Sequence, residues 1–173
     1  MPLLASHPAT PAPLQIAADA ARPAAGRLEL SYLLTGDIAG LVLPAPAPQT
    51  RADDLWRATC FEAFFRPAVG DSYTELNLAP SRAWAAYQFD SYRVGMRAAD
   101  IVPPQIEVEI NPGRIALRAS FDLKSYAGPW RLALSAVLEH RTGAKSYWAL
   151  AHPPGAPDFH HAAGFTLDLA EPA

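Results

Sequence analysis

Residues 54–93 read DLWRATCFEAFFRPAVGDSYTELNLAPSRAWAAYQFDSYR, and this stretch decides the fold. Apolar and polar residues alternate with a period of two in three runs, 59–66, 73–79 and 84–91. Such alternation is typical of β-strands with one buried face. Short segments containing Gly, Pro, Asp and Ser separate the runs, as hairpin connections do. The stretch therefore predicts a meander of three adjacent antiparallel strands.

The register of the first hairpin follows from keeping the apolar residues on one face. Pairing Arg66 with Tyr73 achieves this, whereas a slip by one residue would mix the two faces. The resulting pairs are Phe61 with Leu78, Ala63 with Leu76, Phe65 with Thr74, Glu62 with Asn77, and Phe64 with Glu75.

For the second hairpin, we treat residues 80–83 as a four-residue turn, which pairs Leu78 with Ala85. The same register pairs Leu76 with Tyr87, Thr74 with Phe89, Glu75 with Gln88, and Tyr73 with Asp90. A polar face then carries Glu62, Glu75, Asn77, Gln88 and Asp90. Two interpretations of this face are open. It is either an ordinary solvated surface or a platform that hydrogen-bonds a ligand rich in hydroxyl groups.

Further short runs along the chain alternate in the same way. Within the hairpin of 105–110 and 115–121, pairing Ile110 with Ile115 brings Glu107 opposite Arg118, which supports that register. Other expected strands are 14–17, 27–35, 38–43, 130–138, 145–151 and 165–169, with one helical turn at 53–57. Many short strands with little helix predict an all-β, antiparallel β-sandwich, and a closed barrel is the alternative.

The composition limits the class of protein. A chain of 173 residues suits a single domain over 1–173, with a Pro- and Ala-rich segment at about 1–26. The net charge is −3 and no run of Lys or Arg occurs, so nucleic-acid and anionic-membrane partners are disfavoured. Cys60 is the single cysteine, which excludes an internal disulfide, and we expect it to be a small buried residue.

The N-terminus predicts the compartment. Residues 1–13 lack the basic region of a secretory signal, and Pro interrupts their apolar run. No apolar stretch reaches the ~18 residues of a membrane-spanning helix. We therefore expect a cytoplasmic protein.

Two segments resemble a known superfamily. Residues 55–93 and 146–165, the latter reading SYWALAHPPGAPDFHHAAGF, are similar to the DOMON-like superfamily. This group includes the family 9 carbohydrate-binding modules and the haem- or sugar-binding DOMON domains. The resemblance covers most of the chain and implies a β-sandwich that binds a ligand and performs no chemistry.

The resemblance to family 9 modules implies specific ligand contacts. In those modules an aromatic residue just before the strand stacks on a sugar ring, and an acidic residue on the strand binds hydroxyl groups. Trp56 and Glu62 occupy similar places, although Trp56 also suits a core anchor. Looser matches are Glu75 and Asn77 on the neighbouring strand, and Trp148 and Phe159 as the second stacking aromatic.

Two turns hold further candidates. Arg82 and Trp84 either contact the ligand or cap the second hairpin. Asp158 and His160 share one side of an extended chain, so they would suit a metal ion better than two adjacent His residues, but support of the loop backbone also explains them. Both are candidate ligand contacts. The adjacent His160 and His161 point apart, so they do not suit one ion, and we expect no metal.

Several functions are compatible with these residues. Our main hypothesis is a non-catalytic domain that binds a small soluble sugar or glycan fragment. The alternative is a protein-assembly domain. Haem-binding relatives use a Met and a His, for which Met96 and either His160 or His161 are the candidates. Glu62 and Glu75 could also form a glycosidase pair, which needs carboxyls about 5–9.5 Å apart.

Overall fold

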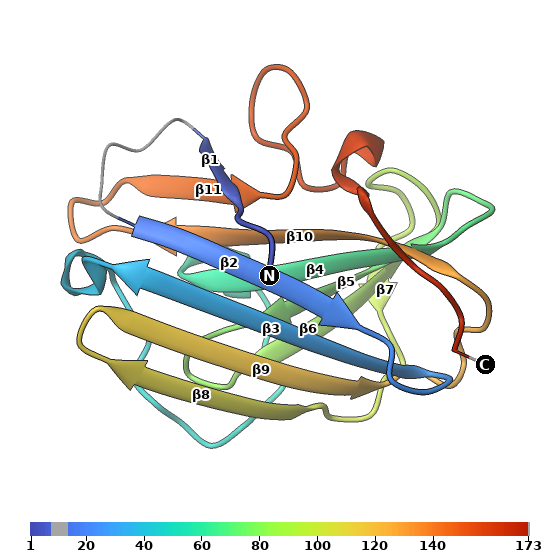
Figure 1. Ribbon diagram of the computed structural model, residues 1–173, viewed down its shortest axis with the longest axis horizontal. Helices are drawn as coiled ribbons and strands as arrows, with labels where there is room; N and C mark the ends of the chain where they lie inside the picture. The colour runs from blue at the N-terminus through green and yellow to red at the C-terminus, as the bar shows by residue number, and fades with distance from the viewer. Residues whose placement is uncertain (8–13, 173) are drawn as a thin grey trace.

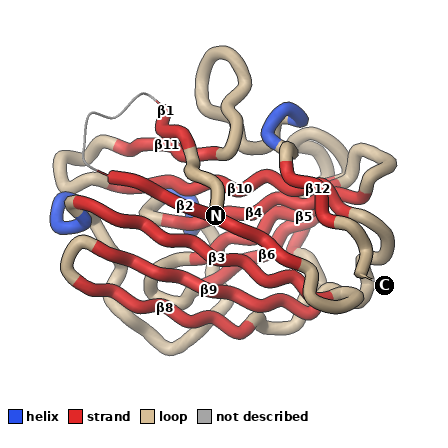
Figure 2. Tube along the Cα trace, viewed as in Figure 1, coloured by secondary structure: helices blue, strands red, loops and turns tan. Residues whose placement is uncertain are grey.

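The computed structural model describes residues 1–7 and 14–172, and it consists of two stacked antiparallel β-sheets (Figures 1 and 2). The larger sheet has the order β1-β11-β10-β4-β5-β6-β7, with β12 also paired to β10. Its strands are β1 (Ala5–His7), β4 (Cys60–Pro67), β5 (Tyr73–Leu78), β6 (Trp84–Phe89), β7 (Arg97–Ala98), β10 (Trp130–Glu139), β11 (Lys145–Ala149) and β12 (Leu167–Leu169).

The smaller sheet has the order β2-β3-β9-β8. Its strands are β2 (Leu14–Ala21), β3 (Arg27–Gly36), β8 (Gln105–Asn111) and β9 (Arg114–Asp122). Within the described residues, helix is confined to three 3-10 turns, η1 (Ile38–Gly40), η2 (Leu55–Arg57) and η3 (Ala162–Gly164), and no helix there could cross a membrane. The predicted antiparallel β-sandwich is confirmed.

Two predicted registers are confirmed. In the β4–β5 hairpin, Phe61 pairs with Leu78 and Glu62 with Asn77. In the β8–β9 hairpin, Ile110 pairs with Ile115, and Glu107 lies opposite Arg118 as expected. Clean alternation in both partner strands made these registers predictable.

The predicted register of the β5–β6 hairpin is wrong by one residue. Leu78 pairs with Trp84, not Ala85, because the loop has three residues and ends in Arg82 with a positive φ of 72°. The Ala79 N–H donates to the Ala83 carbonyl at 2.9 Å and closes this shorter loop. The shift reverses the faces of β6. Trp84 and Gln88 move to the core face, Tyr87 and Phe89 move to the outer face, and Asp90 lies beyond the strand.

Two other predicted strands differ from the structure. β2 runs over eight residues rather than 14–17, because Ala18 and Ala20 continue its buried face. Part of the Pro- and Ala-rich segment is therefore sheet, and its residues 8–13 lie outside the described part of the chain. The predicted strand 38–43 is instead η1 followed by a single bridge from Leu41 to His140.

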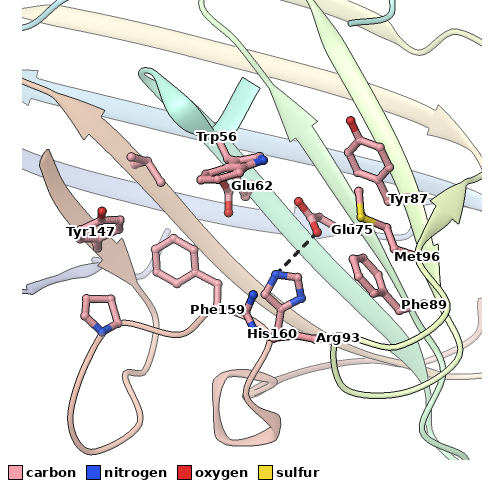
Figure 3. Close-up of a pocket in the computed structure, with 12 residues that line it drawn as sticks. Trp56, Glu62, Glu75, Tyr87, Phe89, Arg93, Met96, Tyr147, Phe159 and His160 are labelled. Atoms are coloured by element: carbon pink, nitrogen blue, oxygen red, sulfur yellow. Dashed lines mark ion pairs between the residues drawn. The ribbon is translucent and has the colours of Figure 1, made fainter. Parts of the chain in front are cut away.

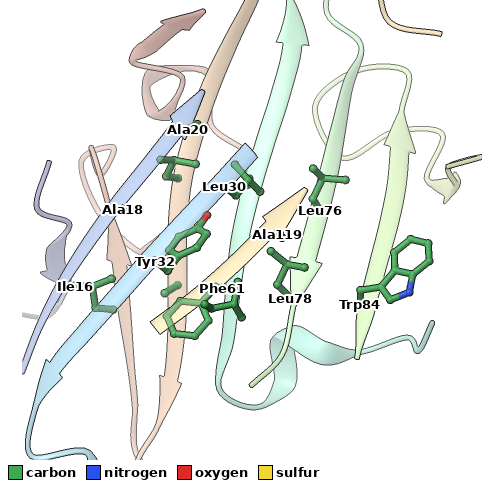
Figure 4. Packing of buried hydrophobic residues seen from close by; sticks show 14 of the residues in the cluster. Ile16, Ala18, Ala20, Leu30, Tyr32, Phe61, Leu76, Leu78, Trp84 and Ala119 are labelled. Carbon is green, nitrogen blue, oxygen red and sulfur yellow. The ribbon is translucent and has the colours of Figure 1, made fainter. Parts of the chain in front are cut away.

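The core lies between the sheets and is filled from both. Phe61 and Tyr32, with ring centroids 5.1 Å apart, face each other across it (Figure 4). The larger sheet also buries much of its outer face, where Phe64 and Tyr73 belong to a second apolar cluster. Loops cover that outer face, and the hollow they leave is the candidate site.

Candidate ligand-binding site

A cavity of about 390 Å³ lies on the outer face of the larger sheet (Figure 3). Its floor includes Glu62 of β4, Glu75 of β5 and Tyr87 of β6. Its rim comes from η2, from the segment before β7, and from the loop after β11. The turn η2 contributes Trp56, and the segment before β7 contributes Arg93 and Met96. The loop after β11 contributes Phe159 and His160.

The two floor carboxyls are neighbours because of the β4–β5 register. Glu62 lies opposite Asn77 while Glu75 lies opposite Phe64, so the two Glu side chains are diagonal on one face. Asn77 Nδ2 donates to Glu75 Oε1 at 2.7 Å. Glu62 is only 3% exposed, and its Oε1 atom is buried with no hydrogen-bond partner among the described residues. A buried polar atom without a partner is costly, and a ligand donor would satisfy it.

Burial also changes the ionisation of this pair. Burial raises the pKa of Glu62 well above its ordinary value, and the nearby charge of Glu75 raises it further. Burial likewise raises the pKa of Glu75, although hydrogen bonding by Asn77 and the charge of Arg93 oppose the rise. The two carboxyls therefore resist carrying two negative charges at once.

His160 is held in one orientation beside the carboxyls. Its Nδ1 lies 2.8 Å from the Tyr73 hydroxyl, which itself accepts the Arg93 N–H at 3.1 Å. That acceptance leaves the hydroxyl proton for Nδ1, so we assign the imidazole proton to Nε2, which is 3.9 Å from Glu75 Oε2. Burial and the Arg93 charge lower the pKa of His160 to about 4. The imidazole is therefore neutral at pH 7, and the contact dashed in Figure 3 is not an ion pair at that pH.

Asp158 links the loop after β11 to the segment after β6 through hydrogen bonds. It accepts Arg93 Nη2 at 2.8 Å, the Tyr92 hydroxyl at 2.5 Å and the His160 backbone N–H at 3.1 Å. Burial acts to raise the pKa of Asp158, but these hydrogen bonds outweigh it and hold that pKa below the ordinary value. Asp158 thus closes the rim rather than lining the cavity.

We expect Asp158→Asn to loosen this loop. The variant loses the ion pair with Arg93, which is half-exposed, so the free energy of unfolding should change by no more than about 1 kcal/mol. Amide hydrogen exchange in residues 151–161 should accelerate. The control is Asp168→Asn, which breaks the exposed Arg131–Asp168 pair outside the pocket. Unchanged exchange in residues 151–161 would show that Asp158 does not hold the loop.

Glu62→Gln should change how stability depends on pH. Because the folded pKa of Glu62 is raised, the folded state keeps a proton that the unfolded state loses above pH 4.5, so wild-type stability falls as pH rises. The lowered pKa of His160 makes stability rise with pH between pH 4 and 6.5. This contribution is the same in wild type and variant, so it cancels from the difference between them. From pH 5 to 8 the free energy of unfolding of the variant should rise relative to that of the wild type, measured by urea unfolding. A constant difference across this range would contradict the raised pKa.

Other residues singled out from the sequence lie away from the cavity. Trp84 and Trp148 are 3% and 4% exposed and pack in the core between the sheets, so placing them at the site is wrong. Arg82 sits in the β5–β6 loop, where its Nη2 donates to the Ala47 carbonyl at 2.9 Å. Asn77 does not line the cavity but donates to Glu75, and His161 caps η3 through its Nδ1.

Six residues that line the cavity were not predicted from the sequence, and four of them carry aromatic or cationic side chains. Tyr87 and Phe89 were assigned to the core face because of the register error. Tyr147 pairs with Val137, which lines the cavity, whereas Trp148 pairs with Ala136, which lies in the core. The alternation along β10 and β11 therefore could have predicted that Tyr147 faces the cavity. Arg93 comes from an irregular segment, and no local pattern marks it.

Haem does not fit the pocket well. Met96 and His160 both line it, but the two nitrogens of His160 already face the Tyr73 hydroxyl and the Glu75 carboxyl. Among the described residues, no group of three or more His, Cys, Asp or Glu side chains could hold a metal ion.

Comparisons with known proteins support the fold. No protein-family model matches the chain, and no curated protein is detectably similar to it in sequence. The chain is similar to the crystal structure of a protein from Bacteroides uniformis ATCC 8492 that is proposed to bind carbohydrate. The TM-score is 0.62 at 13% identity, and the match covers 92% of this chain and 79% of that chain. At this identity the similarity shows a shared fold.

Proposed function

We propose that this chain is a non-catalytic carbohydrate-binding domain of the DOMON-like type, similar to family 9 modules. The observation that carries the proposal is the unpartnered Glu62 Oε1 atom, buried at the floor of a cavity whose rim bears the exposed Trp56 indole. A saccharide matches this pairing, since its ring has an apolar face for an indole and hydroxyl groups for carboxyls.

The rest of the lining supports the same ligand class. In the view of Figure 3, Tyr147 and Phe159 flank the cavity on one side, and Tyr87 and Phe89 on the other. Aromatic walls with a few convergent polar groups are typical of small-molecule sites, and about 390 Å³ is within their usual size. The ligand we propose is therefore a small soluble sugar or a glycan fragment.

A thermal-shift screen tests this proposal. Mono- and disaccharides, amino sugars and haemin are each titrated, because a ligand that binds the folded state raises the unfolding temperature as its concentration passes Kd. We expect stabilisation by at least one saccharide, with the saccharide recovered intact. Hydrolysis of that saccharide would assign the carboxyl pair to a glycosidase instead. Stabilisation by haemin alone, with a Soret band lost in His160→Ala, would assign the pocket to haem.

No stabilisation by any of these ligands would favour the assembly hypothesis. Sedimentation of the protein over a range of concentrations then measures self-association directly. The carbohydrate proposal requires a saccharide response that does not depend on the oligomeric state.

A further inference from the structure

Among the described residues that line the pocket, two carboxyl side chains face one cationic side chain. Arg93 is the cationic side chain lining it among the described residues, and its guanidinium is paired with Asp158 at 2.8 Å. His160 is neutral at pH 7, because burial lowers its pKa to about 4. Glu62 and Glu75 therefore face the cavity without a cation of their own.

The other ionisable groups near the pocket do not supply the missing charge. Tyr87 of β6 donates its hydroxyl proton to Asp53 Oδ1 at 2.6 Å, and Tyr73 of β5 is an uncharged phenol. Arg57 lies beside the rim in η2 and is paired with Asp54 at 3.3 Å. Lys145 of β11 donates its Nζ to the Arg57 carbonyl in η2 and does not line the cavity. Among the described residues that line the cavity, no unpaired cation therefore faces Glu62 and Glu75.

An ammonium group would complete this floor. It supplies N–H donors, one of which would satisfy the unpartnered Glu62 Oε1, and a positive charge that both carboxyls attract. The aromatic walls add a second attraction, because the faces of Trp and Tyr rings carry negative potential toward cations. A neutral hydroxyl would supply a single donor and no charge.

We infer that the ligand is an amino sugar whose ammonium group lies against Glu62 and Glu75. This inference rests on the proposed carbohydrate-binding function and narrows its ligand class. A carboxyl that is protonated in the free protein loses its proton when the ammonium binds, so complex formation releases protons to the buffer. Acylation of the amine removes its charge and should remove the preference.

Isothermal titration calorimetry of the wild-type protein tests the inference. Glucosamine, galactosamine and mannosamine are compared with glucose, galactose and mannose, and with N-acetylglucosamine, at a pH where the free amines are protonated. We expect at least one amino sugar to bind about tenfold or more tightly than its neutral counterpart. Heats in buffers of different ionisation enthalpy should show proton release for that amino sugar alone.

The outcomes separate this inference from the function on which it rests. Neutral sugars that bind as tightly as the amino sugars would overturn the inference and leave carbohydrate binding intact. If no saccharide binds, both are overturned. Glu62→Gln should bring the amino-to-neutral affinity ratio close to one, whereas Glu109→Gln on the exposed part of β8 should leave it unchanged. If Glu62→Gln folds and keeps the wild-type ratio of amino-sugar to neutral-sugar affinity, the role of this carboxyl is contradicted. If the variant does not fold, the comparison of sugars on the wild-type protein still tests the inference.

Discussion

Trp56→Ala is expected to weaken saccharide binding about 30-fold or more, equivalent to about 2 kcal/mol. The Trp56 indole is 47% exposed at the rim of the cavity, so it offers a face on which a sugar ring can stack. The same exposure means that little core packing is lost. The free energy of unfolding should therefore change by less than about 0.5 kcal/mol.

Calorimetry with the best saccharide, together with urea unfolding, measures both quantities. Ile110→Ala is a matched control, since it removes a 41% exposed apolar side chain from β8 in the other sheet. The control should keep wild-type affinity. Wild-type affinity in Trp56→Ala would mean that the indole is not a stacking platform, and a large loss of stability would mean that it anchors the fold.

Phe61→Ala should cause the largest loss of stability, about 3–5 kcal/mol. Phe61 is 0% exposed near the start of β4, and its ring packs on Tyr32 between the sheets. Truncation removes buried apolar surface and leaves a cavity that the two sheets cannot readily collapse into. Such a loss is a large part of the 5–15 kcal/mol typical of small domains.

Urea unfolding with an unchanged slope measures this loss. Val69→Ala is the control, because Val69 is 87% exposed in the β4–β5 loop and should cost less than about 0.5 kcal/mol. A loss below about 1.5 kcal/mol for Phe61→Ala would contradict the position of β4 at the centre of the core.

Strand alternation predicted the fold wherever both partners alternate cleanly. The β4–β5 register followed because a one-residue slip would have placed Glu62 among Phe and Leu side chains. The β5–β6 register did not follow, because it depends on a loop that uses a left-handed residue, Arg82, where composition alone allows a turn of either length. The small Ala18 and Ala20 side chains gave too weak a signal for the second half of β2.

The part of the candidate site that could be predicted from the sequence is the carboxyl pair at its floor. The shared face of Glu62 and Glu75 follows from the register, but their deep burial does not, because the covering segments lie far along the chain. His160, for example, contacts Tyr73 across a separation of 87 residues. No local pattern encodes that contact, which depends on how the loop after β11 folds back over the sheet.

The four tryptophans allow one direct test of the binding site. Each indole N–H gives a separate signal in a ¹H–¹⁵N correlation spectrum, and the signals can be assigned with single Trp→Phe variants. Trp84, Trp130 and Trp148 are buried between the sheets, whereas Trp56 lines the cavity. Titration with a saccharide should shift the Trp56 signal and leave the other three in place. Saturable shifts at the three core indoles without Trp56, or no shift with any saccharide, would contradict carbohydrate binding in this pocket.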